Sequence, residues 1–403
     1  MDTYIARQPI FHRNKKVYAY ELLFRDGVAN AFPDIDGSTA TSRVLLGSFL
    51  GAGIEQFTGD CLAFINFTRD LIVNNVIAGF SSDKVVIEVL ENVTPDDAVL
   101  EACHHAREQG FALALDDFFY QPAYEPLISL ATVIKIDLMQ TPLETIQDLV
   151  HDLRKRQTLT LLAEKVETYE EFQMAIGMGF SLFQGYFFSK PEVLKKRDLA
   201  PSKLNYLRFI MEINKNEMDF NKLESVISQD IAMSFKLFRY INSPYFRRIN
   251  EIQSVRHALT ILGEREIRNF ISVIALSNLA DEKPGELIRT AIFRARFSEL
   301  ISRNAPGIQK ETLFLIGLFS MLDAMLDNTM ENLMHQLPFS EDIKAALVER
   351  SGILGAYLNI TLGCETGEWS ACLPADPHLK IDESKIPEDY LNALQFADAY
   401  MGK

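Results

Sequence analysis

The first 190 residues contain eight short apolar runs, separated by segments that are more polar. Most of the runs are nearly continuous in Val, Ile, Leu, Ala and Phe, which is typical of strands covered on both faces. Most of the intervening segments place apolar residues at helical spacing, as in 42–57, 95–110, 142–156 and 168–180. The apolar runs cover residues 4–11, 16–24, 62–68, 84–91, 111–118, 131–139, 158–167 and 181–188.

This alternation of strands and helices predicts an α/β fold, a TIM-like (β/α)8 barrel. The first two strands are joined only by HRNKK at 12–16, which is too short for a crossover helix. We therefore expect an antiparallel strand pair at the start of an otherwise parallel barrel. An open doubly wound sheet is the alternative, but no early strand is followed by the glycine-rich phosphate loop of its nucleotide-binding form.

Beyond a charged stretch at 195–203, the strand pattern gives way to longer segments with helical apolar spacing. These segments are 221–242, 252–276, 285–304 and 310–326. The acidic tail after Pro374 predicts coil and one more helix near 387–400. The sequence thus predicts a barrel domain at 1–194, a linker at 195–203 and an all-α domain at 204–403.

The chain of 403 residues has a formal net charge of −15, most of it in the first half. This charge disfavours direct binding to nucleic acid, which needs clustered cations, but permits a phosphorylated ligand bridged by metal ions. The four cysteines show no CxxC spacing and are expected to be buried, reduced thiols. Because no apolar run can span a bilayer and the N-terminus lacks a signal-peptide core, we expect a cytoplasmic protein without membrane association.

From the second to the eighth, each apolar run also contains an ionisable or amide side chain toward its C-terminal part. One such residue is usually a satisfied core group, but seven successive strands would each need a buried partner. In a barrel these strand ends meet at one mouth, where carboxylate and amide oxygens suit Mg²⁺ or Mn²⁺. Adjacent aspartates are tolerable there, because a dication opposes their charge. The residues are Glu21, Asn66, Glu88, Asp116 with Asp117, Lys135, Glu164 and Gln184.

At these residues, positions 1–191 resemble the EAL-type cyclic di-GMP phosphodiesterase domain. The namesake motif reads ELLFR at 21–25 and is preceded by RQPI at 7–10. The motifs INFT, IEVLE, LDDF, IKID, AEKVE and FQGYFFSKP follow in order with family-like spacing, so the set is specific although each motif alone is weak. The resemblance implies a metal-dependent enzyme that opens cyclic di-GMP to linear pGpG, in signalling that governs outputs such as motility and biofilm formation.

The resemblance also implies a role for each matching residue. The metal ligands would be Glu21, Asn66, Glu88 and Asp116, with Asp117 at a second ion or its water. The catalytic groups would be Glu21, Lys135 and Glu164, of which the last two would orient or deprotonate the attacking water. Gln184 would complete the shell of that water and bind substrate, and the other substrate contacts would be Gln8, Leu23 and Arg25. Glu91 would stabilise the loop after Asp117.

Three positions depart from the family pattern and leave two interpretations open. Leu22 replaces a small residue, Lys165 stands at a usual glycine, and Phe119 begins an aromatic loop where a Gly/Thr/Ser-rich loop is usual. A positive φ at Phe119 would be strained. We expect Phe119 and Tyr120 to pack and hold the two aspartates in place, which favours an active enzyme. The alternative is a degenerate domain that binds cyclic di-GMP or a protein without turnover.

The helical half resembles the HDOD domain, an output module joined to EAL domains in bacteria, at 229–246, 254–271 and 317–326. The related HD hydrolases need a His-Asp pair, but no histidine immediately precedes Asp323, and His257 has no Asp or second His nearby. We therefore assign the helical half no catalysis and expect it to bind an unidentified protein partner. The resemblance also makes a homodimer an open expectation.

Overall fold

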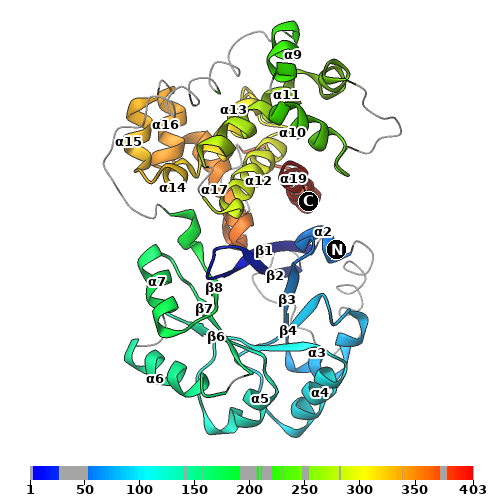
Figure 1. Cartoon of the computed structure of the whole chain (residues 1–403), viewed down its shortest axis with the longest axis vertical. Coiled ribbons are helices and arrows are strands. Elements are labelled where there is room, and N and C mark those ends of the chain that lie inside the picture. Colours follow the sequence, from blue (N-terminus) through cyan, green and yellow to red (C-terminus); the bar gives the residue numbers. More distant parts are fainter. Residues whose placement is uncertain are drawn as a thin grey trace. The chain divides into compact units, whose positions relative to one another are not determined.

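The computed structural model of the chain divides into two compact units (Figure 1). The barrel unit comprises Met1–Lys190 and Glu365–Trp369, and the helical unit comprises Pro191–Cys364 and Ser370–Lys403. The expected linker at 195–203 and most of the expected helix at 42–57 lie outside the described residues, so the domain boundaries stay a prediction. The structure describes residues 3–26, 53–139, 143–156, 158–190, 207, 210, 220–229, 231–246, 254–280, 283–337, 339–372 and 379–402.

The barrel unit is a closed sheet of eight strands that follow one another in sequence order (Figure 1). From β2 onward each strand is parallel to the next, whereas β1 is antiparallel to both β2 and β8. The predicted barrel and its antiparallel first pair are confirmed, and the open sheet is excluded. The strands are β1 Thr3–His12, β2 Val17–Asp26, β3 Leu62–Phe67, β4 Val85–Val89, β5 Ala112–Leu115, β6 Val133–Asp137, β7 Thr160–Glu164 and β8 Leu182–Gln184.

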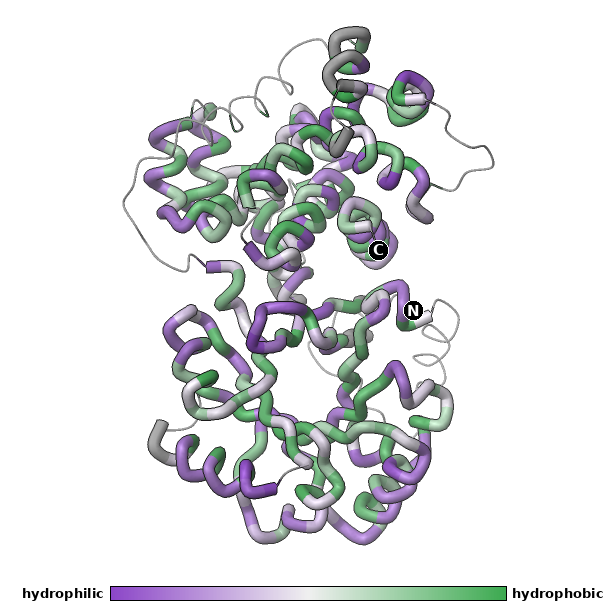
Figure 2. The backbone as a smooth tube through the Cα atoms, viewed as in Figure 1, coloured by the Kyte–Doolittle hydropathy of each residue, from purple (hydrophilic) through white to green (hydrophobic). Residues whose placement is uncertain are grey.

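Helices lie between successive strands and surround the barrel, where Figure 2 shows polar stretches along the helices and apolar strands inside. The helix after β4 has Asp96 as its N-cap, and the Asp96 side chain accepts a hydrogen bond of 2.9 Å from the Val99 backbone N–H. These helices are α2 Glu55–Thr58, α3 Arg69–Val73, α4 Asp97–Glu108, α5 Glu125–Leu130, α6 Leu143–Leu153 and α7 Tyr169–Met178. Single 3₁₀ turns occur at η1 Val76–Gly79, η2 Pro122–Tyr124 and η3 Tyr186–Ser189.

One residue from each strand contributes to a buried apolar layer inside the barrel. Side chains two positions apart on a strand point to the same side of the sheet. On β2 to β8, the residue two positions further along the strand therefore also faces the interior, one layer closer to the mouth. On the antiparallel β1, it is the residue two positions earlier. The apolar layer consists of Ile10, Ala19, Phe64, Val86, Ala114, Val133, Leu162 and Leu182.

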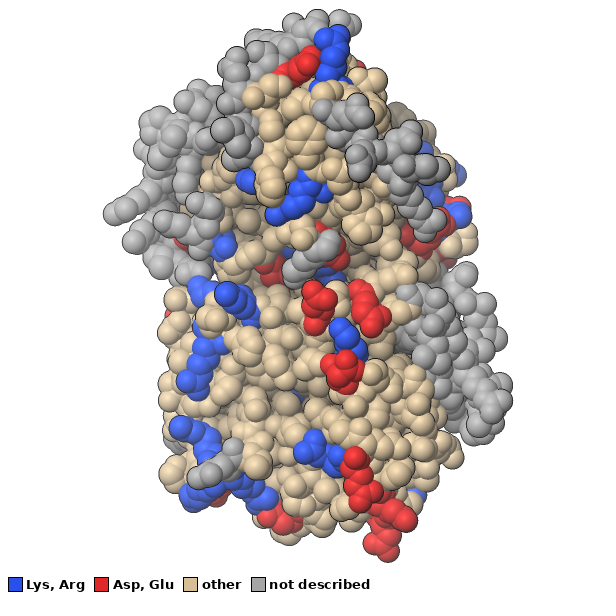
Figure 3. All heavy atoms as spheres, turned by 45° about the vertical axis from the view of Figure 1, so that its right-hand side comes forward, with Lys and Arg blue, Asp and Glu red and all other residues tan. Residues whose placement is uncertain are grey.

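Acidic and basic side chains lie next to one another in several places on the face drawn in Figure 3. Exposed ion pairs of the barrel unit include Arg69 with Asp96 at 2.7 Å and Lys155 with Asp152 at 2.6 Å. Such pairs contribute little to stability, because water screens both charges. Lys155 and Asp152 therefore offer matched controls for substitutions of buried lysine and aspartate residues.

The described part of the second unit is helical, as predicted. The expected segment 221–242 forms two helices, and the long helix that begins at Val255 is interrupted at Gly263, where φ is 74°. No helix among the described residues has both the length and the apolar character needed to cross a bilayer. The helices are α9 Phe220–Gln229, α10 Ile231–Ile241, α11 Val255–Leu279, α12 Gly285–Ile301, α13 Lys310–Phe319, α14 Leu322–Leu326, α15 Met330–Gln336, α16 Glu341–Val348, α17 Gly352–Thr366, α18 Trp369–Cys372 and α19 Ile386–Met401, with η4 at Glu383–Lys385.

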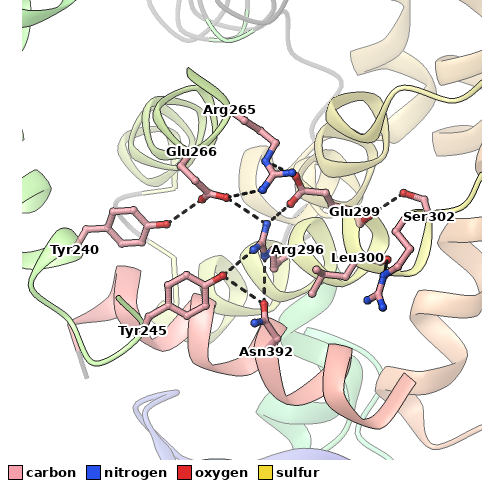
Figure 4. Close-up of polar contacts among 10 residues, drawn as sticks. Tyr240, Tyr245, Arg265, Glu266, Arg296, Glu299, Leu300, Ser302 and Asn392 are labelled. Carbon is pink, nitrogen blue, oxygen red and sulfur yellow. Dashed lines mark hydrogen bonds and ion pairs between the residues drawn. The ribbon is translucent and has the colours of Figure 1, made fainter. Parts of the chain in front are cut away.

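Helix α12 forms the centre of the helical unit and packs against α13 and α19. Its Arg296 is buried and donates to Glu299 at 2.6 Å and to the Tyr245 hydroxyl at 2.7 Å (Figure 4). The same guanidinium reaches Asn392 of α19 at 3.4 Å. Thus the last helix, expected from an acidic tail, is part of the core of this unit.

Candidate active site

The polar residues predicted from the sequence form a second layer directly above the apolar layer. Each of the seven residues from β2 to β8 lies two positions after the apolar-layer residue of the same strand. Asp116 is the one that lies just past the end of its strand, β5. Gln8 belongs to the same layer, because β1 runs in the opposite direction and Gln8 lies two positions before Ile10. The layer therefore consists of Gln8, Glu21, Asn66, Glu88, Asp116, Lys135, Glu164 and Gln184.

Lys135 lies at the centre of this polar layer. Its Nζ atom is 2.8 Å from an oxygen of Asp116, 2.9 Å from Glu164 and 3.3 Å from Glu21. It also contacts Glu88, and both of these side chains are fully buried. One ammonium group thus brings together four carboxylates that come from four different strands or the residue just after one.

Two amide side chains complete the contacts around Glu21. Asn66 Nδ2 donates to Glu21 Oε1 at 3.2 Å, and Gln184 Nε2 donates to Glu21 Oε2 at 2.7 Å. Gln184 Nε2 also donates to Gln8 Oε1 at 3.0 Å. The amide donors therefore face Glu21, which leaves the amide oxygens of Asn66 and Gln184 free for another partner.

The acids of the layer are only partly compensated by Lys135. Burial, then the charge of Glu21, raises the pKa of Glu88 well above its ordinary value. Burial raises the pKa of Glu164 to about 8, although Lys135 opposes this shift. Burial alone would lower the pKa of Lys135, but the surrounding carboxylates raise it well above its ordinary value. The layer therefore has an excess of negative charge that a cation would relieve.

Four buried oxygens of the layer have no hydrogen-bond donor in the described structure: Asn66 Oδ1, Glu88 Oε2, Glu164 Oε2 and Gln184 Oε1. An oxygen buried without a partner is costly, so these atoms suggest a missing ligand. In addition, oxygens of Asp116, Asp117 and Glu164 lie within 4.8 Å of one another. Hard oxygens in this arrangement suit a divalent cation. The residues therefore fit the metal ion that the sequence predicted. Glu164, which the sequence assigned to the attacking water, lies close enough to the two aspartates to share a cation with them.

The loop after Asp117 is anchored by Phe118 and Tyr124. The Phe118 backbone N–H donates to the Lys135 carbonyl at 3.0 Å, and the buried Phe118 ring lies edge-on to Tyr124 with centroids 6.4 Å apart. The side chains of Phe119 and Tyr120 are 48% and 52% exposed. The expectation that Phe119 and Tyr120 pack to hold the aspartates is therefore wrong, because their neighbours fill that role.

Positive φ angles occur on both sides of the mouth, but not at Phe119. Asp117 has φ of 38° and Lys165 has φ of 53°, whereas Phe119 keeps a negative φ. The strain suggested for Phe119 is thus absent and lies two residues earlier. A cavity of about 130 Å³ remains beside Asp116 and Asp117, under the aromatic loop.

The remaining predicted residues lie further from the polar layer. Leu23 is partly buried on β2, two positions after Glu21. Arg25 also belongs to β2, but its side chain is outside the described residues. Glu91 is exposed and contacts the loop through its backbone, since its carbonyl accepts from the Tyr124 hydroxyl at 3.3 Å. The roles of these three residues stay predictions.

Sequence reasoning missed Asp137, which is 3% exposed. It lies two positions after Lys135 on β6, so the same period of two that reveals the polar layer points to it. Its carboxylate contacts the Lys165 ammonium and accepts from the Met139 backbone N–H at 2.7 Å. Asp137 and Lys165 thus form an ion pair at the mouth, next to the acids.

Comparison with known families gives two matches along the chain. The EAL domain model matches residues 59–191, and the HDOD domain model matches residues 200–341. The protein named cyclic di-GMP phosphodiesterase CdgJ, from Vibrio cholerae, is 36% identical over 98% of this chain and 92% of its own length. The uncharacterised protein YuxH of Bacillus subtilis is 31% identical over 100% of this chain and 99% of its own. The chain therefore belongs to the family of two-domain EAL–HDOD proteins.

Solved structures give weaker likenesses. BlrP1 from Klebsiella pneumoniae, in a complex with calcium and cyclic di-GMP, is 25% identical over 47% of this chain and 56% of its own, with a TM-score of 0.39. YkuI from Bacillus subtilis, an EAL-domain protein solved with cyclic di-GMP and calcium, is 21% identical over 66% of this chain and 72% of its own, with a TM-score of 0.39.

Proposed function

We propose that this chain is a cyclic di-GMP phosphodiesterase that uses a divalent metal ion and releases linear pGpG. Support comes from the full-length relative named for this activity, CdgJ. The observation that carries most weight is the polar layer, in which four buried oxygens lack a donor within the described structure. Cyclic di-GMP carries two phosphodiester charges, so an acidic mouth can hold it only through intervening cations.

Within this proposal, the polar layer holds the metal. Glu21, Asn66, Glu88 and Asp116 would ligate the first ion, Mg²⁺ or Mn²⁺, and Asp117 would lie at a second ion or its water. A bound dication neutralises charge at the phosphorus and lowers the pKa of water. Substrate contacts beyond the metal would come from Gln8, Leu23, Arg25 and Gln184.

Lys135 and Glu164 have different roles in the proposed reaction. Lys135 stays protonated, because the acids around it raise its pKa, so it can donate hydrogen bonds but cannot act as a base. Glu164, with a pKa of about 8 in the metal-free site, is suited to exchange a proton near neutral pH. Glu164 would take a proton of the attacking water as its oxygen bonds to phosphorus, and the 3′ oxygen would leave as that P–O bond breaks and take up a proton from solvent.

The direct test is incubation of the purified full chain with cyclic di-GMP and Mn²⁺ or Mg²⁺, with the linear product followed by chromatography. We expect turnover that is abolished by EDTA. The Asp116→Asn variant should lose at least about 10²-fold in turnover, because the metal loses an anionic ligand and the reacting groups move. The matched control is Asp152→Asn on the exposed face of α6, which should retain wild-type turnover.

Failure of this test would favour the second interpretation. If the wild-type chain binds cyclic di-GMP but forms no pGpG with either ion, the barrel is a non-catalytic cyclic di-GMP receptor. The exposed Phe119 and Tyr120 are the observation in favour of that outcome, because they leave the loop above the aspartates less closely packed than expected.

The helical unit completes the proposal as the regulatory half of a cytoplasmic signalling protein. It would bind a protein partner rather than react, since no histidine immediately precedes the partly buried Asp323. A homodimer would be a further state of the active protein. If the helical unit hydrolysed substrate, the Asp116→Asn variant would keep substantial activity. The oligomeric state can be measured by light scattering of the full chain.

A further inference from the structure

Lys165 has an unusual backbone conformation at the mouth of the barrel. It follows the last residue of β7, Glu164, and its φ of 53° lies in the left-handed region that a long side chain rarely adopts. The next backbone N–H, that of Val166, donates to the Gln184 carbonyl at 3.0 Å and fixes the turn onto β8. This conformation directs the ammonium of Lys165 to Asp137, at the end of β6.

The Lys165 ammonium is a second fixed cation near the acids, distinct from Lys135. Its side chain is 48% exposed, whereas that of Asp137 is 2% exposed, so the pair spans the boundary between solvent and the barrel interior. Lys165 also lies close to the neighbouring acids. It directly follows Glu164, and a carboxylate oxygen of Glu164 lies within 4.8 Å of oxygens of Asp116 and Asp117. The positive charge of Lys165 is therefore placed near the acids that include Asp117.

Asp117 is also the residue assigned to a second divalent ion, whereas the first ion would lie among the strands around Lys135. The two sides of the cluster thus differ in the lysine that offsets their negative charge. Lys135 is fully buried among four carboxylates, whereas the side chain of Lys165 is half exposed and pairs with Asp137 at the mouth. Like charges repel, so an ammonium held there disfavours a dication beside Asp117.

We propose that Lys165, anchored by Asp137, is a built-in cation that lowers the affinity of the site for a second divalent ion. This inference deepens the proposed phosphodiesterase function and rests on it for the identity of the metal site. Its consequence is that occupancy of the second position depends on the free metal concentration, so that metal supply sets how much of the protein is doubly loaded.

The test is a titration of the substrate-free full chain with Mn²⁺, in which electron paramagnetic resonance measures the free ion. We expect the wild type to bind one Mn²⁺ tightly and a second at least about tenfold more weakly. A tenfold difference in affinity corresponds to a coupling free energy of about 1.4 kcal/mol. The Lys165→Met variant retains the length of the side chain without its charge. It should bind the second ion about tenfold or more tightly than the wild type does.

Three further variants make the result specific. Lys165→Arg retains the charge and should keep the weak second affinity within about threefold. Lys155→Met, which removes an exposed lysine from the same unit, should change neither affinity. The double variant Lys165→Met with Asp137→Asn tests whether the freed Asp137 becomes a ligand itself; under the proposal the tight second site persists in it.

The proposal is overturned if Lys165→Met leaves the second affinity within twofold of wild type, or if the gain disappears in the double variant. A raised KM for cyclic di-GMP with unchanged Mn²⁺ binding would also overturn it, since it would place Lys165 on the substrate. The absence of hydrolysis by the wild type would defeat the proposed function alone, because this titration uses only protein and Mn²⁺.

Discussion

At the scale of single residues, burial raises the pKa values of the acids in the site, and the charge of Lys135 opposes that rise. Four carboxylates share the buried ammonium of Lys135, and burial raises the pKa values of the acids Glu88, Asp117 and Glu164. A carboxyl group that holds its proton in the folded chain but loses it in the unfolded chain makes folding sensitive to pH. The metal-free protein should therefore reveal its metal requirement through its stability.

We predict that the metal-free protein loses stability as pH rises from about 5 to 8. The ordinary pKa of glutamate is 4.5, and that of Glu164 in the folded chain is about 8. Between these values the folded state binds more protons than the unfolded state, so the free energy of unfolding falls as pH rises. Thermal unfolding in EDTA across this range measures the slope.

Two comparisons test the origin of that slope. Saturating Mn²⁺ should flatten it, because the ion takes the place of the proton. The Glu164→Gln variant should also show a smaller slope in EDTA, since the group no longer titrates. An equal slope in wild type and variant would show that another group is responsible.

Much of the polar layer could be predicted from the sequence, because it depends only on which face of a strand a side chain occupies. Glu21, Asn66 and Gln184 each interrupt an apolar run, and the period of two in a strand places them together. The Lys165–Asp137 pair could not be predicted in this way. It depends on a positive φ at Lys165 after β7, and although Lys165 stands at a usual glycine, nothing in the sequence connects that position with Asp137.

At the scale of elements, the aromatic loop between β5 and α5 is the part that the sequence described least well. The sequence shows several aromatic residues in a row but not which of them turn inward. The strained φ of Asp117 rotates the chain so that Phe118 enters the core and the next two side chains face solvent. Local rotation of one residue therefore decides which aromatic side chains support the aspartates.

We predict that Tyr124→Ala lowers turnover by about tenfold, whereas Phe119→Ala leaves it within about twofold. Tyr124 contacts the Phe118 ring and the Glu91 carbonyl, so its loss frees the loop that holds Asp117, and small displacements of reacting groups are costly. Steady-state kinetics with cyclic di-GMP measures both variants. Phe119→Ala is the control for loss of an aromatic ring from the same loop, and a larger effect there would restore the original expectation.

At the scale of the whole molecule, each of the two units has its own buried ionic centre. Lys135 contacts four carboxylates in the barrel, and Arg296 contacts Glu299, Tyr245 and Asn392 in the helical unit. Removal of one partner from a buried charge network leaves the remaining charges uncompensated and typically costs about 3–5 kcal/mol. Each centre thus offers a way to weaken one unit by itself.

We predict that Lys135→Met and Arg296→Met lower different thermal transitions in scanning calorimetry of the full chain. A domain with its own core can unfold as its own unit, so each substitution should shift only the transition of the unit that contains it. The exposed Lys155→Met control should shift neither. If both variants lowered one shared transition equally, the two units would unfold as a single cooperative body.

The antiparallel first strand has a consequence for how the protein is made. β1 leaves the ribosome first, yet one of its two partners is β8, which ends at Gln184. Contacts between residues so distant in sequence form late, because the intervening chain must be ordered or held close before they are gained. During synthesis, β1 and β2 can therefore pair early as a hairpin, in which the edge of β1 stays open after β3 has covered that of β2. That edge is exposed to other nascent chains until β8 at Leu182–Gln184 has emerged, which makes chaperone protection most valuable over this interval.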